Sequence, residues 1–380
     1  MPKSIKNIYL DYAASAMPNP SSIHREGIFV KKKLENARRQ VAEILFVRPE
    51  EIIFTSGGTE GNNLAIQGIV LASQVKKPHI ITTNIEHPSV LETCKLLEKR
   101  RLTQISIVPV EASGIINPKK IRQAIKENTV LVSVMYANNE IGTIQPIKEI
   151  AKEIKNFNKI NSKKILFHTD AVQAVNYLDL NVEKLGVDLL TLSGSKIPGA
   201  GRVGVLYKKK TVPLAPIFGG GDQEGGLRPG TENLPEILKF AQAFTAAGKI
   251  KDEEAKRLLK LRDYFVNRLN YSTILTNSRI VFNGDLGNRL PNNINITFPK
   301  IPSDLLVIEL SARGVMCSSK SACKSLQAEG SYVIKALRPD ADPEIGGLRF
   351  SFGRATKKED IDYTVQCLTQ ILTKLKKWYN

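Results

Sequence analysis

Two charged side chains lie at or just after the ends of apolar runs that predict strands. A ligand with a reactive ring could bind at these positions. Asp170 closes the run KILFHTD, and Lys196 follows DLLTLSGS. Ligands of open α/β sheets bind beyond the carboxyl ends of the strands. There, a desolvated lysine can form a Schiff base, and a carboxylate can keep a ring such as that of pyridoxal phosphate protonated as an electron sink. Taken singly, Asp170 could cap a helix and Lys196 could be a solvated charge.

Two further strand ends carry groups suited to a cofactor. After EIIFT the chain reads Ser-Gly-Gly-Thr-Glu, in which Gly58 and Thr59 open a helical stretch. Glycines let backbone amides approach an anion and a helix N-terminus adds a favourable dipole, so a phosphate cradle is predicted, although plain turns of this composition are common. After HIITTNIE, His87 opens the next helix, where an imidazole could stack on a planar ring or act as acid or base.

One of the four cysteines has the surroundings of a reactive thiol. Cys323 lies in the small, polar segment SSKSACKS, with a lysine on either side. Positive charge nearby favours the thiolate, which is the nucleophilic form. Cys94 and Cys367 lie in amphipathic helical patterns and are predicted to be buried, and Cys317 ends a strand-like run and is predicted to be structural. The nucleophile is therefore expected at Cys323.

Composition narrows the class of protein. The chain has 380 residues, 42% of them hydrophobic, which suffices for a large core and two domains. There is no secretory or membrane-spanning apolar run and no C-x-x-C pair, so a cytoplasmic protein without membrane association is expected. Four scattered histidines predict no catalytic metal. The net charge of +18 comes from 55 basic against 37 acidic residues, and the lysines fall in short runs spread along the chain without interleaved aromatics, so direct nucleic-acid binding is not expected.

The elements that must position these residues follow from alternating apolar runs and amphipathic stretches. Seven runs predict one mostly parallel sheet covered by helices: EIIFT, HIITT, TQISIVPV, VLVSVMYA, KILFHTD, DLLTLS and GRVGVLY. Helices are predicted over 22–46, from the Gly/Pro-rich segment 219–235 to about residue 269, and over 358–378, with shorter strands in RIVFN, NINITF, GVMCSS and GLRFSFG. The predicted fold class is α/β, with a large domain over 15–232 and a smaller α+β domain formed by 1–14 and 233–380.

Read together, these motifs resemble the cysteine desulfurases, the NifS/IscS group of fold-type-I pyridoxal-phosphate enzymes in the class-V aminotransferase superfamily. The resemblance runs through nearly the whole chain. It is carried, in order, by YLDYAASA, NPSSIHREG, FTSGGTEGNN, EHPSV, YANNEIGTIQ, HTDAVQA, SGSK, GGGDQEGGLRPGTEN, SKSACKS and GLRFSFG.

The resemblance implies roles for individual residues. Lys196 matches the lysine that binds pyridoxal phosphate as a Schiff base, Cys323 the sulfur-accepting cysteine, and His87 the histidine that stacks on the ring and shuttles protons. Asn138 and Arg349 match residues that bind the substrate carboxylate. Cofactor contacts are also implied at the phosphate for Gly58, Thr59, Ser193 and Ser195, and at the ring for Asn138, Asp170 and Gln173.

The activity that the resemblance implies is conversion of L-cysteine to L-alanine with a persulfide formed on Cys323, for an iron–sulfur scaffold or a tRNA-thiolating protein. Thr231 matches a threonine that reaches the phosphate of the partner subunit, which implies a homodimer. Ser195 stands where the family usually has histidine, and Lys320 where it usually has glycine. The alternatives are an aminotransferase, a selenocysteine lyase or a non-catalytic assembly partner, and the presence of Cys323 favours the desulfurase.

Overall fold

A computed structural model describes residues 8–272, 278–319, 330–340, 342 and 345–379. Its largest element is a seven-stranded sheet in the order β1-β7-β6-β5-β4-β2-β3, in which only β7 runs antiparallel to its neighbours. The strands are β1 Ile52–Thr55, β2 His79–Thr83, β3 Gln104–Val108, β4 Thr129–Ser133, β5 Leu166–Asp170, β6 Leu189–Ser193 and β7 Gly204–Lys208. Each overlaps one of the seven predicted runs, which confirms the α/β class with a mostly parallel sheet.

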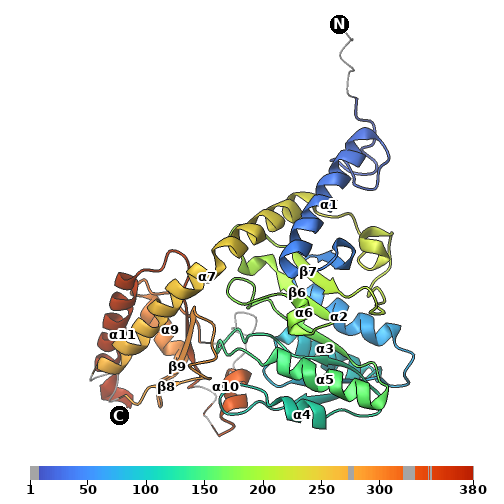
Figure 1. Cartoon of the computed structure of the whole chain (residues 1–380). Helices are drawn as coiled ribbons and strands as arrows, with labels where there is room; N and C mark the ends of the chain where they lie inside the picture. The colour runs from blue at the N-terminus through green and yellow to red at the C-terminus, as the bar shows by residue number, and fades with distance from the viewer. Residues whose placement is uncertain (1–7, 273–277, 320–329, 341, 343–344, 380) are drawn as a thin grey trace.

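Helices cover both faces of this sheet (Figure 1). α2 (Gly58–Ala72) and α3 (Pro88–Lys99) pack on one face, and α1 (Arg25–Leu45), α5 (Ile147–Asn161) and the first half of α7 (Leu234–Tyr271) pack on the other. The shorter helices of this layer are α4 Pro118–Gln123 and α6 Val182–Leu185. Because both faces are covered, a ligand can reach the sheet only at the ends of its strands.

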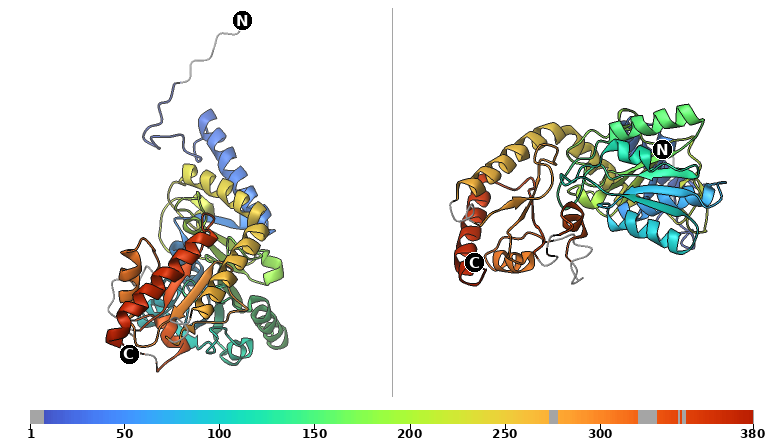
Figure 2. Two further views of the ribbon diagram at one scale, coloured as in Figure 1. Left: turned by 90° about the vertical axis from the view of Figure 1, so that its left-hand side faces the viewer. Right: turned by 90° about the horizontal axis from the view of Figure 1, so that it is seen from below.

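A second, smaller unit lies beside the first, and α7 runs from one to the other (Figures 1 and 2). It has an antiparallel sheet in the order β10-β9-β8 and an apolar core of its own. Its elements are β8 Val281–Phe282, β9 Asn293–Thr297, α9 Ser303–Ser311, α10 Tyr332–Leu337, β10 Leu348–Ser351 and α11 Lys358–Tyr379. α10 contributes to the core of the larger unit. The boundaries 15–232 and 233–380 stay a prediction.

The strand predicted in GVMCSS is wrong. Only Ser318 pairs there, exchanging backbone hydrogen bonds of 3.2 and 2.7 Å with Arg349. Gly314 has a φ of +79°, which breaks the extended backbone, and Met316 is 85% exposed. The segment therefore lacks the buried face that makes an apolar run a strand.

Candidate active site

A cavity of about 560 Å³ lies between the carboxyl ends of the large sheet's strands, α7 and the end of β10. The predicted residues that line it are Gly58, Thr59, His87, Asp170, Gln173, Ser193, Ser195, Lys196 and Arg349. They come from both units of the fold and from widely separated parts of the sequence. The strand-end reasoning therefore led to one cavity, while the chemical role of each residue remains a proposal.

The glycine turn before α2 makes an anion cradle. A Cβ atom on Gly58 would lie 2.9 Å from Val172 Cγ2 and 3.4 Å from Ser193 Cβ, so the backbone comes close to β6 only because the side chain is missing. The hydroxyls of Ser193, which is next to Gly58, and of Ser195 lie 2.9 Å apart. Free amides at the start of a 15-residue helix, together with two hydroxyls, suit a phosphate group.

Asp170 ends β5 and is 5% exposed. One carboxylate oxygen accepts a hydrogen bond from the Val172 amide at 3.0 Å, and the other accepts from Asn62 Nδ2 at 2.7 Å. Asn62 was not predicted. It lies on α2 one helical turn after Gly58, so the i, i+4 spacing within GGTEGNN could have indicated it.

His87 caps α3, and Pro88 at the first helical position fixes the start of that helix. Its Nδ1 atom accepts a hydrogen bond from the Ser89 amide at 3.1 Å and lies 2.8 Å from Ser89 Oγ. Burial lowers the pKa of His87; the nearby Lys196 ammonium lowers it further, and the Asp170 carboxylate opposes both. His87 is therefore neutral near pH 7.

Lys196 lies in the short 3-10 turn Gly194–Lys196 that follows β6. The turn is held by Asn176, whose Nδ2 donates to the Lys196 carbonyl at 2.6 Å, and by the Gly194 amide, which donates to the Val203 carbonyl at 2.7 Å. The Lys196 side chain is exposed, so protein atoms alone do not supply the desolvation expected from the sequence. A bound cofactor would cover it.

The prediction for Asn138 needs a correction. Its side chain is fully buried and does not line the cavity: Nδ2 donates to the Ile85 carbonyl at 2.8 Å, and Oδ1 accepts from the amides of Glu140 and Ile141 at 2.8 and 2.9 Å. The next residue, Asn139, lines the cavity instead, and its Oδ1 has no hydrogen-bond partner among the described residues. The candidate contact to substrate and cofactor thus moves from Asn138 to Asn139.

Arg349 reaches the cavity from β10 and joins the two units. Its Nη1 donates to the Asn139 carbonyl at 2.9 Å. Burial lowers the pKa of Arg349 below its ordinary value, and the Glu140 carboxylate and the Cys317 thiol oppose that shift. A guanidinium remains charged even so, and it presents a flat donor edge that matches a carboxylate.

The structure places Thr231 away from the lining of the cavity. Thr231 is exposed and does not line it, and its predicted contact to a partner subunit stays a prediction. Cys323 lies outside the described residues. Cys94 and Cys367 are buried, as predicted. Burial raises the pKa of the Cys317 thiol to about 12, so this cysteine is a poor nucleophile at neutral pH.

The described ranges contain no candidate metal cluster and no helix suited to cross a membrane. Within them, no group of three or more His, Cys, Asp or Glu residues could hold a metal ion. The helices described for this chain include none that is both long and apolar enough to cross a membrane.

The fold and the cavity suit a pyridoxal-phosphate enzyme, and similarity to known proteins supports that class. The model of the aminotransferase class-V family matches residues 2–364. A cysteine desulfurase IscS from Dictyoglomus turgidum is 40% identical over 98% of this chain and 96% of its own length, and one from Methanosarcina thermophila is 40% identical over 98% and 90%. A solved NifS-like protein has a TM-score of 0.84 at 36% identity, covering 94% of this chain and 92% of its own. The chain belongs to the class-V aminotransferase family, and within it to the cysteine desulfurases.

The residues present fit the cofactor of this family. The Gly58 cradle, which a Cβ atom would fill, and the hydroxyls of Ser193 and Ser195 suit its phosphate. The buried Asp170 carboxylate suits a protonated ring nitrogen, and Lys196 lines the same cavity.

Proposed function

We propose that this cysteine desulfurase converts L-cysteine to L-alanine and keeps the sulfur as a persulfide on Cys323. The observation that carries the proposal is the single cavity in which Lys196, Asp170, His87 and Arg349 meet. A solved relative with 31% identity and a TM-score of 0.73 is described as SspA in complex with cysteine, which supports the same substrate here.

The chain's own residues divide the work as follows. Bound pyridoxal phosphate supplies an electron sink for the substrate carbon. Arg349 binds the substrate carboxylate, and Lys196 Nζ accepts the Cα proton. Cys323 Sγ attacks the substrate sulfur as a thiolate: an S–S bond forms, the Cβ–S bond breaks, and the electron pair of the broken bond stays on carbon. That carbon takes up a proton, protonated Lys196 returns a proton to Cα, and the product leaves as L-alanine.

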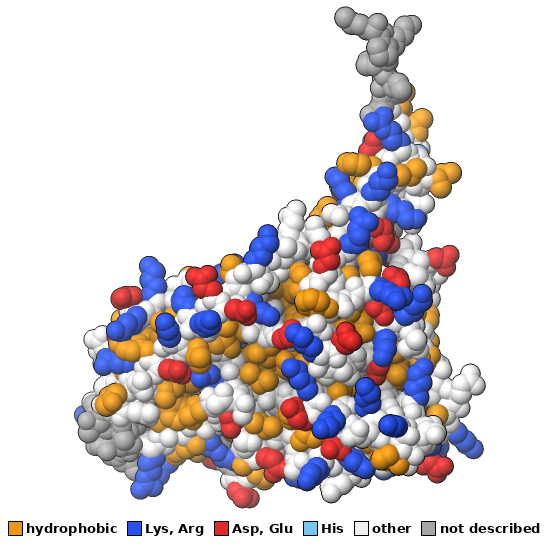
Figure 3. Space-filling view, viewed as in Figure 1, with side chains coloured by type: hydrophobic (Ala, Val, Ile, Leu, Met, Phe, Trp, Pro, Cys, Tyr) orange, Lys and Arg blue, Asp and Glu red, His pale blue; other side chains and the backbone are white. Residues whose placement is uncertain are grey.

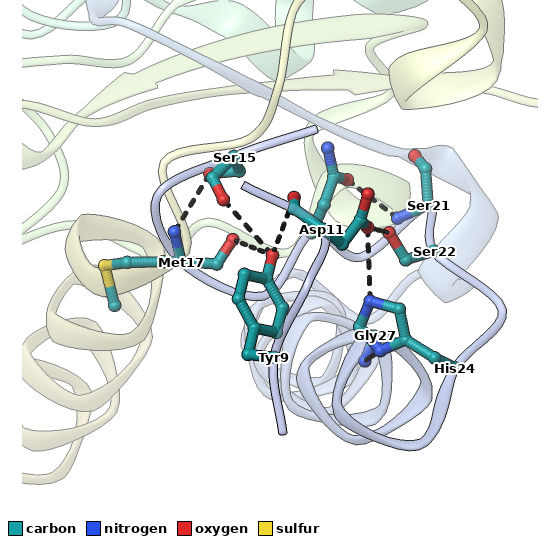
Figure 4. Close-up of polar contacts among 9 residues, drawn as sticks. Tyr9, Asp11, Ser15, Met17, Ser21, Ser22, His24 and Gly27 are labelled. Atoms are coloured by element: carbon teal, nitrogen blue, oxygen red, sulfur yellow. Dashed lines mark hydrogen bonds and ion pairs between the residues drawn. The ribbon is translucent and has the colours of Figure 1, made fainter. Parts of the chain in front are cut away.

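The protein acts as a homodimer in this proposal. Before α1, large apolar side chains are exposed, including Leu10 at 89% and Ile23 at 93% (Figure 3). The segment nevertheless has a defined conformation, in which the Asp11 carboxylate lies 3.2 Å from His24 Nε2 (Figure 4). A held segment with exposed apolar side chains suits burial against a second copy of the chain. The same association would allow Thr231 to reach the partner's cofactor phosphate.

The persulfide sulfur passes to an acceptor, either an iron–sulfur scaffold or a tRNA-thiolating protein. We place the reaction in the cytoplasm, because a catalytic thiol and the free cysteines Cys94, Cys317 and Cys367 suit a reducing compartment. Purified wild type and each acceptor type, incubated with labelled L-cysteine, would show which one takes up the label.

A direct test compares wild type, Cys323→Ala and the matched control Cys317→Ala. L-Alanine formation from L-cysteine should be lost in Cys323→Ala, while the visible absorption of bound cofactor remains and Cys317→Ala stays near wild type. Retained alanine formation in Cys323→Ala would contradict the assignment of the nucleophile. Bound cofactor without cysteine-dependent alanine in wild type would favour another class-V reaction, such as transamination.

A further inference from the structure

A chain of hydrogen bonds connects Asp170 to His87 through two side chains, Asn62 and Ser89, to which the sequence motifs assigned no role. Asn62 Nδ2, on α2, lies 2.7 Å from Asp170 Oδ2 and 2.8 Å from Ser89 Oγ. Ser89 Oγ, on α3, lies 2.8 Å from His87 Nδ1. Asn62 and Ser89 are 1% and 8% exposed, so bulk water does not compete for these contacts. Both also line the cavity.

The chemistry of the groups determines the direction of each bond. A carboxylate only accepts hydrogen bonds, so Asn62 turns its NH2 group toward Asp170, and the same group donates to Ser89 Oγ. Ser89 Oγ is then the acceptor toward Asn62, and its own proton is available for His87 Nδ1. The Ser89 amide, which can only donate, also points at Nδ1, at 3.1 Å.

We infer that Asn62 and Ser89 are positioning residues that hold His87 as the neutral tautomer with its proton on Nε2. Two donors converge on Nδ1, so that nitrogen keeps its lone pair, and a neutral imidazole must carry its proton on the other nitrogen. Among the described residues, the charged groups that shift the pKa of His87 are Asp170 at the end of β5 and Lys196 after β6. Burial and Lys196 lower the pKa of His87 while Asp170 raises it, and the net lowering agrees with a neutral ring.

This inference rests on the proposed desulfurase activity and makes its proton transfers more specific. A histidine in this tautomer offers an N–H donor from Nε2 and has no unprotonated nitrogen for the Cα proton unless the Ser89 contacts break. Lys196 is then the base, and His87 acts as a stacking and hydrogen-bonding group. Because Asp170 is bound to the same Asn62 amide, the group assigned to the ring nitrogen and the histidine are held in one unit.

The test is nuclear magnetic resonance of the cofactor-loaded protein labelled with 15N-histidine. The chain has only four histidines, and a His87→Gln variant assigns the signals of interest. The variants are Ser89→Ala, which removes the hydroxyl donor, Ser89→Thr, which restores one, and Thr93→Val as the control. Thr93 lies one turn further along α3, and its hydroxyl bonds Asn63 and the Ser89 carbonyl rather than His87.

In wild type, Nδ1 should resonate as an unprotonated nitrogen and Nε2 as a protonated one. Ser89→Ala removes one hydrogen bond to the neutral form, so the protonation equilibrium of His87 should shift about fivefold toward the imidazolium. Ser89→Thr and Thr93→Val should match wild type. A proton on Nδ1 in wild type, or titrations of wild type and Ser89→Ala that coincide, would overturn the inference.

Steady-state alanine formation across pH separates this inference from the proposed function. In Ser89→Ala, the limb that reports His87 should move to higher pH, while Thr93→Val keeps the wild-type profile. If wild type made no alanine from L-cysteine, the proposed function would fail while the tautomer remained measurable. If alanine formed normally and the Ser89→Ala profile did not move, only the role of Ser89 would fail.

Discussion

Asn138→Ala should mainly lower the stability of the protein, whereas Asn139→Ala should mainly lower its affinity for the substrate. The Asn138 side chain is fully buried and bonds the Ile85 carbonyl and the amides of Glu140 and Ile141 at 2.8 to 2.9 Å. These bonds hold the loop that follows β4 in its turn. The Asn139 side chain lines the cavity, and its Oδ1 has no partner among the described residues.

The expected magnitudes follow from these contacts. Asn138→Ala leaves three buried backbone groups without partners, each costing about 1–3 kcal/mol, and partial relaxation of the loop should limit the loss of unfolding free energy to about 3–5 kcal/mol. Asn139→Ala breaks no such bond, so stability should change by less than about 1 kcal/mol. A hydrogen bond to a charged substrate group is worth about 1.5–3 kcal/mol, so the KM for L-cysteine should rise about 10- to 100-fold in Asn139→Ala.

The assays are urea unfolding followed by circular dichroism and steady-state alanine formation. Asn161→Ala, at the exposed end of α5, controls for the loss of an asparagine and should match wild type in both. The reasoning would be refuted if Asn138→Ala kept wild-type stability and raised KM, because Asn138 would then be the substrate contact. An unchanged KM in Asn139→Ala would refute the other half.

Three further predictions concern a buried ion pair, a buried carboxyl group and a serine hydroxyl of the cavity. Arg38 forms a buried bidentate pair with Glu224, at 2.7 and 2.9 Å, so Arg38→Met should strand a buried carboxylate and cost about 3–5 kcal/mol in denaturant unfolding. Burial, with a smaller contribution from Asp170, raises the pKa of Glu86 from 4.5 to about 8. Between pH 4.5 and about pH 8, the folded state therefore keeps a proton on Glu86 that the unfolded state releases, so the free energy of unfolding falls as the pH rises through this range. Glu86→Gln should make this fall smaller, as measured by denaturant unfolding at pH 5 and pH 8. Ser195→Ala removes the hydroxyl bonded to Ser193 and should weaken cofactor binding about fivefold in a titration of the apoenzyme, whereas an unchanged affinity would exclude a phosphate contact.

The fold could be predicted well because each strand of the large sheet is a short apolar run between amphipathic helices. What the pattern could not predict is direction. β7 is antiparallel to β1 and β6, but it is buried on both faces like its parallel neighbours, so its composition is the same as theirs. The strand prediction for GVMCSS was wrong because its apolar composition suggested a buried strand, whereas Met316 of this segment faces solvent.

The sequence could indicate cavity-lining residues where these lie at the ends of strands, and not where they lie further inside helices. Asp170 ends β5, and Lys196 and His87 lie three and four residues beyond β6 and β2; a position at the strand ends indicates a ligand site on physical grounds. Asn62 lies one turn into α2 and Ser89 in the first turn of α3, and in our inference both act through other side chains. The contact between Asn62 and Ser89 depends on α2 and α3 packing side by side, which the spacing of residues within either helix does not encode.

Asn138 and Asn139 show most clearly what the sequence alone could not distinguish. Two identical side chains stand next to each other in a loop, so neither residue type nor periodicity distinguishes them. The turn distinguishes them, because the amides of Glu140 and Ile141 both donate hydrogen bonds to Asn138 Oδ1. The Asn138 side chain satisfies its own loop, so we propose that Asn139, which lines the cavity, supplies the contact to a ligand. The paired measurement of stability and KM tests this division of labour directly, because a single residue performing both tasks would move both quantities in one variant.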